Sequence, residues 1–199
     1  MSEQKDLMGL SRTTADAECL RSVKPPYTFG KSEYLGNAVS CTVSTLDGVK
    51  DWVGDGQVFA MWKDMIKHDL VVTYNGVPFD YPLWGGSMLG PEHMEAKKFF
   101  EKSLKGKTID LCKDFQEALG VKVSLNNVAI PTLGDAKEME GGFAPDHWRA
   151  GRCMEVIEYC RGDVRRTDAL FVLAASGQTL KVKTKSGEIR EFTCTPKIR

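Results

Sequence analysis

The chain has 199 residues, of which 42% are hydrophobic, and its 27 basic residues are balanced by 27 acidic residues. This length and composition predict one domain with one hydrophobic core, spanning residues 1–199. A formal net charge of zero excludes a protein that coats duplex DNA by generic, salt-dependent attraction. It does not exclude an enzyme in which bound divalent ions supply positive charge at a phosphate.

Hydropathy and cysteine spacing favour a soluble, cytoplasmic protein without a membrane partner. No apolar run reaches the roughly 18 residues of a membrane-spanning helix, and the N-terminus lacks the pattern of a secretion signal. The six cysteines form no Cys-x-x-Cys pair, and the sequence has only three histidines. We therefore expect free thiols in a reducing compartment, without disulfides or structural zinc.

The first half of the chain has the hydrophobic pattern of three strands, a helix and a further strand. After a polar lead at residues 1–9, β-branched residues recur in segments that are typical of strands. Val58, Met61 and Met65 then follow one another at helical spacing. The expected elements are strands at 13–18, 35–45 and 49–52, a helix at 57–67 and a strand at 70–74.

The second half is expected to contain helices, one more core strand and a C-terminal hairpin. Gly85 and Gly86 are expected to break the helix that follows the fourth strand, and Pro91 can begin the next one. Asp110 is expected to cap the helix after it. The glycines and prolines of 121–145 indicate a loop that could form a flap beside a site. The expected elements are a helix at 81–89, a helix from 91, a strand at 107–111, a helix through 119, helices from 146 to 173 and a hairpin at 180–194.

Three acidic motifs follow one another along the chain. Asp16 and Glu18 are two residues apart in a predicted strand, so both carboxylates lie on one face. Asp80 follows a buried strand and an Asn-Gly turn, while Tyr159 and Asp163 are four residues apart on one face of a predicted helix. Each motif alone is commonly a solvated surface group. Together and in this order, they make four carboxylates and a phenol available to one site.

The three segments resemble the three motifs of the DEDD (DnaQ-like) superfamily of RNase H-like exonucleases, in the subgroup with tyrosine in the third motif. That superfamily includes the proofreading domains of DNA polymerases and ribonuclease D. The pattern is most similar to stand-alone phage and bacterial relatives, and the resemblance covers residues 10–175. It implies an α/β fold, an RNase H-like mixed five-stranded sheet flanked by helices, to which the chain adds a C-terminal β-hairpin at about 178–196.

The resemblance also implies a 3′–5′ exonuclease that hydrolyses phosphodiester bonds at the 3′ end of single-stranded or frayed DNA. Two Mg²⁺ or Mn²⁺ ions would be held by Asp16, Glu18, Asp80 and Asp163. Tyr159 would orient the attacking water. All five residues would then be catalytic.

Four further residues are candidates for contact with the terminal nucleotide. Leu20 could form a wedge against the terminal base, and Phe79 or Tyr81 could stack on it. Each aromatic ring is equally consistent with core packing. Asn75 is either a turn residue that supports Asp80 or a substrate contact.

Several alternatives remain open on the sequence alone. The same fold and metal site would suit a 3′–5′ exoribonuclease or an endonuclease, and a catalytically silent module that binds a partner is a third hypothesis. Nucleic acid is the expected partner, with DNA 3′ ends favoured over RNA, and a separate polymerase or replication protein is a further candidate. Two sets of lysines are either phosphate contacts or solvated faces: Lys98, Lys102 and Lys105, and Lys181, Lys183 and Lys185.

Overall fold

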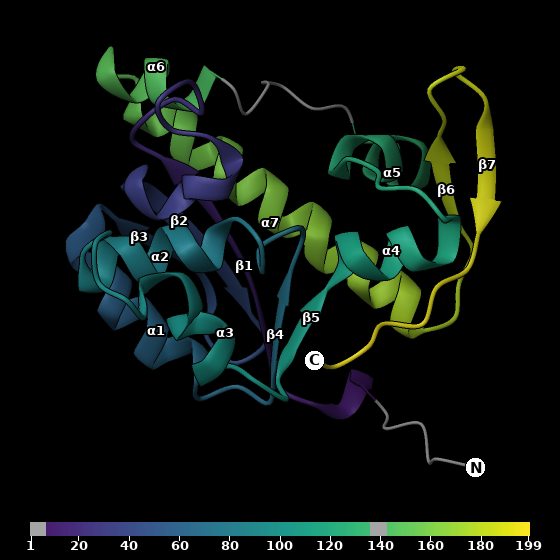
Figure 1. The fold of residues 1–199 in the computed structure, drawn as a ribbon. Coiled ribbons are helices and arrows are strands. Elements are labelled where there is room, and N and C mark those ends of the chain that lie inside the picture. Colours follow the sequence, from purple (N-terminus) through teal and green to yellow (C-terminus); the bar gives the residue numbers. More distant parts are fainter. Residues whose placement is uncertain (1–6, 136–142) are drawn as a thin grey trace.

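The structure is a computed structural model that describes residues 7–135 and 143–199. Its centre is a five-stranded sheet with the strand order β3-β2-β1-β4-β5 (Figure 1). β1 pairs antiparallel with β2 and parallel with β4, so the predicted mixed sheet is confirmed. The strands are β1 (Arg12–Cys19), β2 (Asn37–Ser44), β3 (Gly48–Val53), β4 (Leu70–Thr73) and β5 (Thr108–Asp110).

Helices cover both faces of the sheet (Figure 1). On one face α1, α2 and α3 pack against Ala15 and Ala17 of β1, and on the other face α7 crosses β1 and β2. β4 is buried at every position because both of its faces are covered. The α-helices are α1 (Val58–Met65), α2 (Asp80–Leu89), α3 (Phe99–Ser103), α4 (Leu111–Leu119), α5 (Leu125–Leu133), α6 (Ala144–Arg149) and α7 (Cys153–Ala175), and the short 3₁₀ segments are η1 (Leu7–Gly9), η2 (Phe29–Tyr34), η3 (Asp55–Gln57) and η4 (Ala96–Lys98).

Asp168 fixes α7 onto the central strand. Its carboxylate accepts hydrogen bonds from Nε of Arg12 at 2.9 Å and from the hydroxyl of Thr14 at 2.9 Å. Both partners lie on the face of β1 opposite to Ala15, because side chains alternate along a strand. The register between α7 and β1 is therefore set by a partly buried ion pair and not by apolar packing alone.

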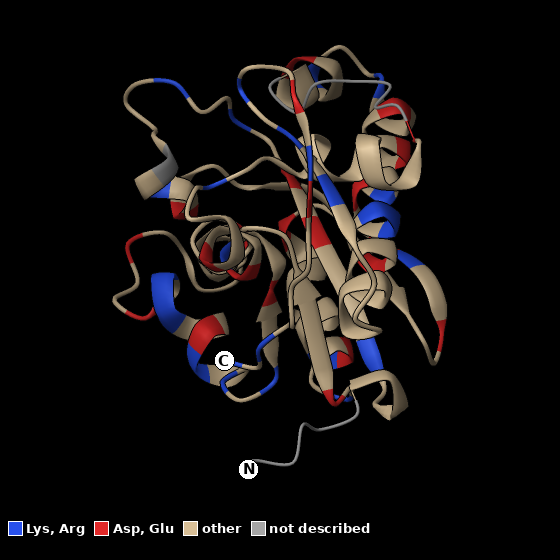
Figure 2. Cartoon of the chain, turned by 90° about the vertical axis from the view of Figure 1, so that its right-hand side faces the viewer, with Lys and Arg blue, Asp and Glu red and all other residues tan. Residues whose placement is uncertain are grey.

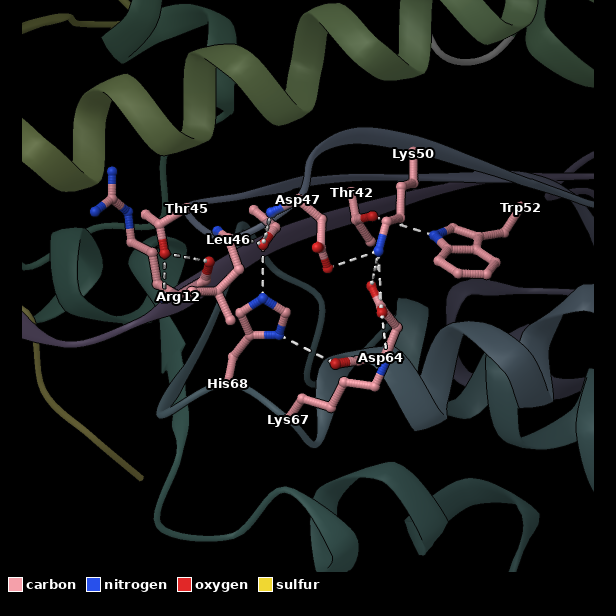
Figure 3. Close-up of polar contacts among 11 residues, drawn as sticks. Arg12, Thr42, Thr45, Leu46, Asp47, Lys50, Trp52, Asp64, Lys67 and His68 are labelled. Atoms are coloured by element: carbon pink, nitrogen blue, oxygen red, sulfur yellow. Dashed lines mark hydrogen bonds and ion pairs between the residues drawn. The ribbon is translucent and has the colours of Figure 1, made fainter.

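A buried polar group links α1 to the β2–β3 turn, near the start of β1 (Figure 3). The ring of His68 is fully buried; Nδ1 lies 3.1 Å from the carbonyl oxygen of Asp64, and Nε2 lies 2.6 Å from the hydroxyl of Ser44. Lys50 reaches from β3 to both carboxylate oxygens of Asp64 at 3.1 Å. His68 is therefore a structural histidine whose two ring nitrogens are both engaged.

The predicted break in the helix at 81–89 is wrong, because α2 runs without interruption through Gly85 and Gly86. A Cβ atom on Gly85 would lie 1.8 Å from the carbonyl oxygen of Ala96, and one on Gly86 would lie 2.0 Å from that of Glu33. The two glycines therefore let neighbouring backbone approach the helix, which is a packing role that sequence patterns do not distinguish from helix breaking.

Two other expected elements differ in the structure. The segment 121–145, expected to be a loop, contains α5, whose first turn is capped by Ser124 accepting from the backbone N–H of Asn127 at 3.4 Å. The residues after Pro91 form turns before η4 and the short α3, and not one continuous helix. Residues 136–142 of the expected flap, like the first six residues of the polar lead, lie outside the described residues.

The C-terminal hairpin is confirmed as β6 (Leu180–Lys183) and β7 (Ile189–Phe192). Leu180 and Val182 turn inward, and Thr132 of α5 hydrogen-bonds both the N–H and the carbonyl oxygen of Lys181 at 2.9 Å. All six cysteines are free thiols. In the described part of the chain, no helix combines the length and the apolar character needed to cross a membrane.

Candidate active site

Asp16 and Glu18 lie on the face of β1 that α7 covers, opposite to the alanines that pack against α1 and α2. Glu18 is buried and Asp16 is half-buried. One carboxylate oxygen of each and the sulfur of Cys160 all lie within 4.8 Å of one another. The strand periodicity therefore predicted this pair of acids correctly, on one face and close together.

Tyr159 and Asp163 extend this group from α7. Both side chains are buried, and the Tyr159 hydroxyl donates a hydrogen bond to Asp163 one turn further along the helix. Burial raises the pKa of Tyr159 well above its usual range, and the negative charges of Asp163, Glu18 and Asp16 raise it further. The phenol is therefore neutral, and the negative charges of three acids act on it.

Asp80 begins α2 directly after the turn that follows β4, and only 2% of it is exposed. Burial raises the pKa of Asp80 far above its ordinary value; the charges of Asp16 and Asp110 add to this rise, and the nearby Thr73 side chain opposes it. Asp80 is thus electrostatically coupled to the β1 acids. Within the described residues, Asp16 and Glu18 are the predicted metal ligands whose oxygens lie within 4.8 Å of one another, and Asp80 and Asp163 lie outside that group. The charges of Asp163, Glu18 and Asp16 act on Tyr159, and that of Asp16 acts on Asp80.

The turn that leads to Asp80 is held by Asp110 at the end of β5. Its carboxylate accepts from the backbone N–H groups of Asn75 at 2.8 Å and Val77 at 3.2 Å, as well as from Cys112 at 3.1 Å. The predicted capping of α4 is confirmed, and the contact with the turn is a second role that the sequence did not indicate. A Cβ atom on the intervening Gly76 would lie 1.9 Å from Oγ1 of Thr73, so only glycine fits there.

A cavity of about 650 Å³ opens beside this group of acids. Glu18 and Tyr159 form one part of its wall, and Asn75 and Phe79 form another. Asn75 has a left-handed backbone with φ of 63°, and its side-chain oxygen accepts from Lys122 at 2.6 Å. Two of the four predicted substrate contacts, Asn75 and Phe79, therefore face a hollow of the size that ligand pockets have.

The other two predicted substrate contacts do not line this cavity. Tyr81 is fully buried, with its ring packed against Phe100 and its hydroxyl hydrogen-bonded to Thr108 at 2.9 Å, so stacking on a nucleotide is corrected to core packing. Leu20 is half-buried; its backbone N–H donates to the carbonyl oxygen of Gly36 at 2.9 Å.

Sequence reasoning missed Arg166, which brings a positive charge to the acids. Its Nη1 lies 3.2 Å from Asp163, and its Nε lies 3.0 Å from Asp135, with 9% of the residue exposed. The spacing of three residues between Asp163 and Arg166 on a helix could have indicated the pair. Cys160 is also part of the group, but burial raises the pKa of its thiol, which therefore remains protonated and neutral.

No protein-family model and no curated protein sequence matches this chain. Among solved structures, it is similar to a family B DNA polymerase from the hyperthermophilic archaeon Pyrobaculum calidifontis, with a TM-score of 0.55 and 14% sequence identity. The match covers 84% of this chain and 26% of the polymerase chain. The fold is RNase H-like. The predicted fold class is thereby confirmed, and an identity this low shows the fold alone.

Proposed function

We propose that the chain is a metal-dependent 3′–5′ exonuclease that acts on the 3′ end of single-stranded or frayed DNA. The observation that carries the proposal is the pair of β1 carboxylates, whose charges act with that of Asp163 on one neutral phenol of α7, next to a cavity of about 650 Å³. Asp80 of α2 is coupled to this group through Asp16. A buried acid such as Asp80, whose pKa is raised by burial and by the charge of Asp16, costs stability unless a cation neutralises it, so a structural role alone does not explain it.

The donor set fits magnesium or manganese. Asp16, Glu18, Asp80 and Asp163 offer hard oxygen ligands, and the neutral thiol of Cys160 is a poor ligand for any cation. When bound, two such ions would stabilise charge on the phosphate, lower the pKa of a water and stabilise the leaving oxygen. These four acids would hold the ions.

The chain's own groups would position the reactants. The Tyr159 hydroxyl, which is neutral and within hydrogen-bond reach of Asp163, would hold the attacking water in line with the phosphorus. The water would lose a proton to solvent as its oxygen bonds to phosphorus. The bond from phosphorus to the 3′-oxygen would break, and that oxygen would take up a proton from solvent to leave as a hydroxyl. Phe79 would stack on the terminal base in the cavity, and Lys122 would lie close to a phosphate at its rim.

DNA is favoured over RNA as the substrate because the similar solved structure is a DNA polymerase. The matched 26% of that chain would then correspond to an exonuclease domain. Among the described residues that line the cavity, none singles out a 2′-hydroxyl, the group by which proteins distinguish RNA.

The test is incubation of 5′-labelled DNA and RNA oligonucleotides with the protein and Mn²⁺, with and without chelator. We expect a ladder of 3′-shortened DNA that the chelator abolishes. Asp163→Asn should lower the rate at least about a thousandfold, whereas Tyr159→Phe should lower it about 10- to 100-fold, because positioning contributes less than charge neutralisation.

Glu158→Gln is the matched control, since Glu158 is an exposed acid on the same turn of α7. Its activity should equal that of the wild-type protein. The proposal would be contradicted by DNA that stays intact at every metal concentration, or by shortening that continues in chelator and in Asp163→Asn.

A further inference from the structure

A second hollow of about 420 Å³ lies on the other side of the turn that precedes Asp80. Val77 and Tyr81 contribute to its wall from the turn and α2, and Thr108 does so from β5. The rest of its wall is mainly cationic: Lys98, Lys102, Lys105, Lys113 and Arg199, with Glu101 as the one acid that lines it within the described chain. Figure 2 shows the lysines of η4 and α3 in blue beside the C-terminus.

We propose that this basic hollow binds the phosphate backbone of the nucleic-acid strand whose 3′ end enters the cavity beside Glu18 and Tyr159. The inference rests on the proposed function and adds to it a surface for the body of the substrate. It predicts contacts that depend on salt and not on base sequence, because lysines act as point charges towards phosphates.

Positive charge is concentrated in this hollow, although the formal net charge of the chain is zero. Its five cations come from three separate parts of the sequence, and like charges that the fold brings together repel one another. Arg199 is neutralised by Asp114 at 2.7 Å and by Glu117 at 3.1 Å, and Lys102 pairs with Glu95.

Three exposed lysines, by contrast, form no ion pair with any described carboxylate. They are Lys98, Lys105 and Lys113. Their ammonium groups face solvent around one depression, which is the arrangement that an anionic ligand with several charges would neutralise.

The hollow and the cavity are lined by neighbouring residues of the same segments. Asn75 and Phe79 line the cavity, while Val77, between them in the sequence, lines the hollow. At the start of α4, Cys112 lines the cavity and the next residue, Lys113, lines the hollow. Asp110 hydrogen-bonds the turn between them, and a strand leaving the cavity would cross this turn to reach the lysines.

The test compares two triple variants with the same change in charge. Lys98→Glu/Lys105→Glu/Lys113→Glu alters the hollow, and Lys181→Glu/Lys183→Glu/Lys185→Glu alters exposed lysines of the β6–β7 hairpin. Fluorescence anisotropy in chelator, where no strand is cut, measures binding of a single strand of about 16 nucleotides, of a trinucleotide and of a polyglutamate peptide.

We expect the hollow variant to bind the long strand at least about tenfold more weakly at low salt, and to lower the slope of log K against log salt by about 2, as expected for three lost phosphate contacts. Trinucleotide binding should not change, and the hairpin variant should bind the long strand about as well as the wild-type protein. Equal loss in both triple variants, no loss in either, or tighter binding of polyglutamate than of DNA would overturn the proposal.

This outcome is separable from that of the nuclease test. A protein that binds the long strand through these lysines but cuts no nucleic acid would support the basic hollow and contradict the exonuclease. A protein that shortens DNA while the hollow variant binds and cuts long strands as well as the wild type would contradict the hollow alone.

Discussion

Asp80 is the acid of the candidate site with the least exposed side chain, at 2%. Its charge is unfavourable for two reasons, burial and the nearby charges of Asp16 and Asp110, and both raise its pKa. In the window between the usual carboxyl pKa of roughly 4 and this raised value, the folded protein holds a proton that the unfolded chain has lost. Stability should therefore fall as pH rises through that window.

Asp80→Asn removes this charge and keeps the shape. Without divalent metal we expect the variant to be more stable than the wild-type protein at pH 7, and the difference to vanish near pH 4, where both side chains are neutral. Thermal melting in chelator at both pH values measures this. Asp168→Asn is the contrast, because it removes the charge that pairs with Arg12 and replaces the oxygen that accepts from Nη2 of Arg12 with an amide donor, which should cost about 2 kcal/mol at pH 7. A lower melting temperature for Asp80→Asn at pH 7 would contradict the account.

The sequence predicted the acidic residues better than the residues around them. Asp16, Glu18 and Tyr159 follow from motif spacing, because periodicity determines which side chains share a face. The burial of Tyr81 could not be predicted, since it depends on Thr108 being close enough to satisfy the phenol. The residue type alone does not distinguish an aromatic ring that stacks on a base from one that packs in the core.

At the scale of elements, the packing of α2 depends on two glycines, which have no side chain. The carbonyl oxygen of Glu33 would lie 2.0 Å from a Cβ atom on Gly86, and η2 and η4 both pack against this helix. Tyr81 and Trp84 of this helix are fully buried, and the packing of η2 and η4 fixes the helix that begins with Asp80. The packing of α2 therefore positions one of the candidate ligands.

Gly86→Ala tests this packing. Alanine favours a helix by about 1 kcal/mol over glycine, yet we expect a net loss of about 2 kcal/mol because backbone must move to admit the methyl group. Urea unfolding measures the free energy of unfolding. Ser87→Ala, at the next position of α2, should not lower it, since the described structure gives its buried hydroxyl no hydrogen-bond partner to lose. A gain in stability for Gly86→Ala would show that the close approach is not limiting.

The strands were predictable and the short helices were not, for a physical reason. β2 has an alternating, β-branched sequence whose pattern is local, whereas α5 contains Pro131 and is followed by a glycine, both of which favour a loop. The cap at Ser124 and contacts with the hairpin compensate for this weak propensity. Tertiary contacts of this kind are absent from a single sequence.

At the scale of the whole molecule, the strand order explains how distant acids meet. β1 is the central strand, between β2 and β4, so its outward carboxylates face α7 while the end of β4 leads through a turn to Asp80. Acids that are up to 147 positions apart, from Asp16 to Asp163, thereby act on the same phenol. A cation bound among them should stabilise the folded state by mass action, because the unfolded chain has no such site.

The most direct test of this central claim is calorimetric titration of Mn²⁺ into the wild-type protein and into Asp16→Asn, with both shown to be folded by circular dichroism. Asp16 lies beside Glu18, and its charge acts on both Asp80 and Tyr159, so its loss should weaken binding most. We predict saturable Mn²⁺ binding by the wild-type protein that falls at least about tenfold in affinity in Asp16→Asn. Equal binding by the two proteins, or none by either, would contradict the proposal that these acids form one metal site.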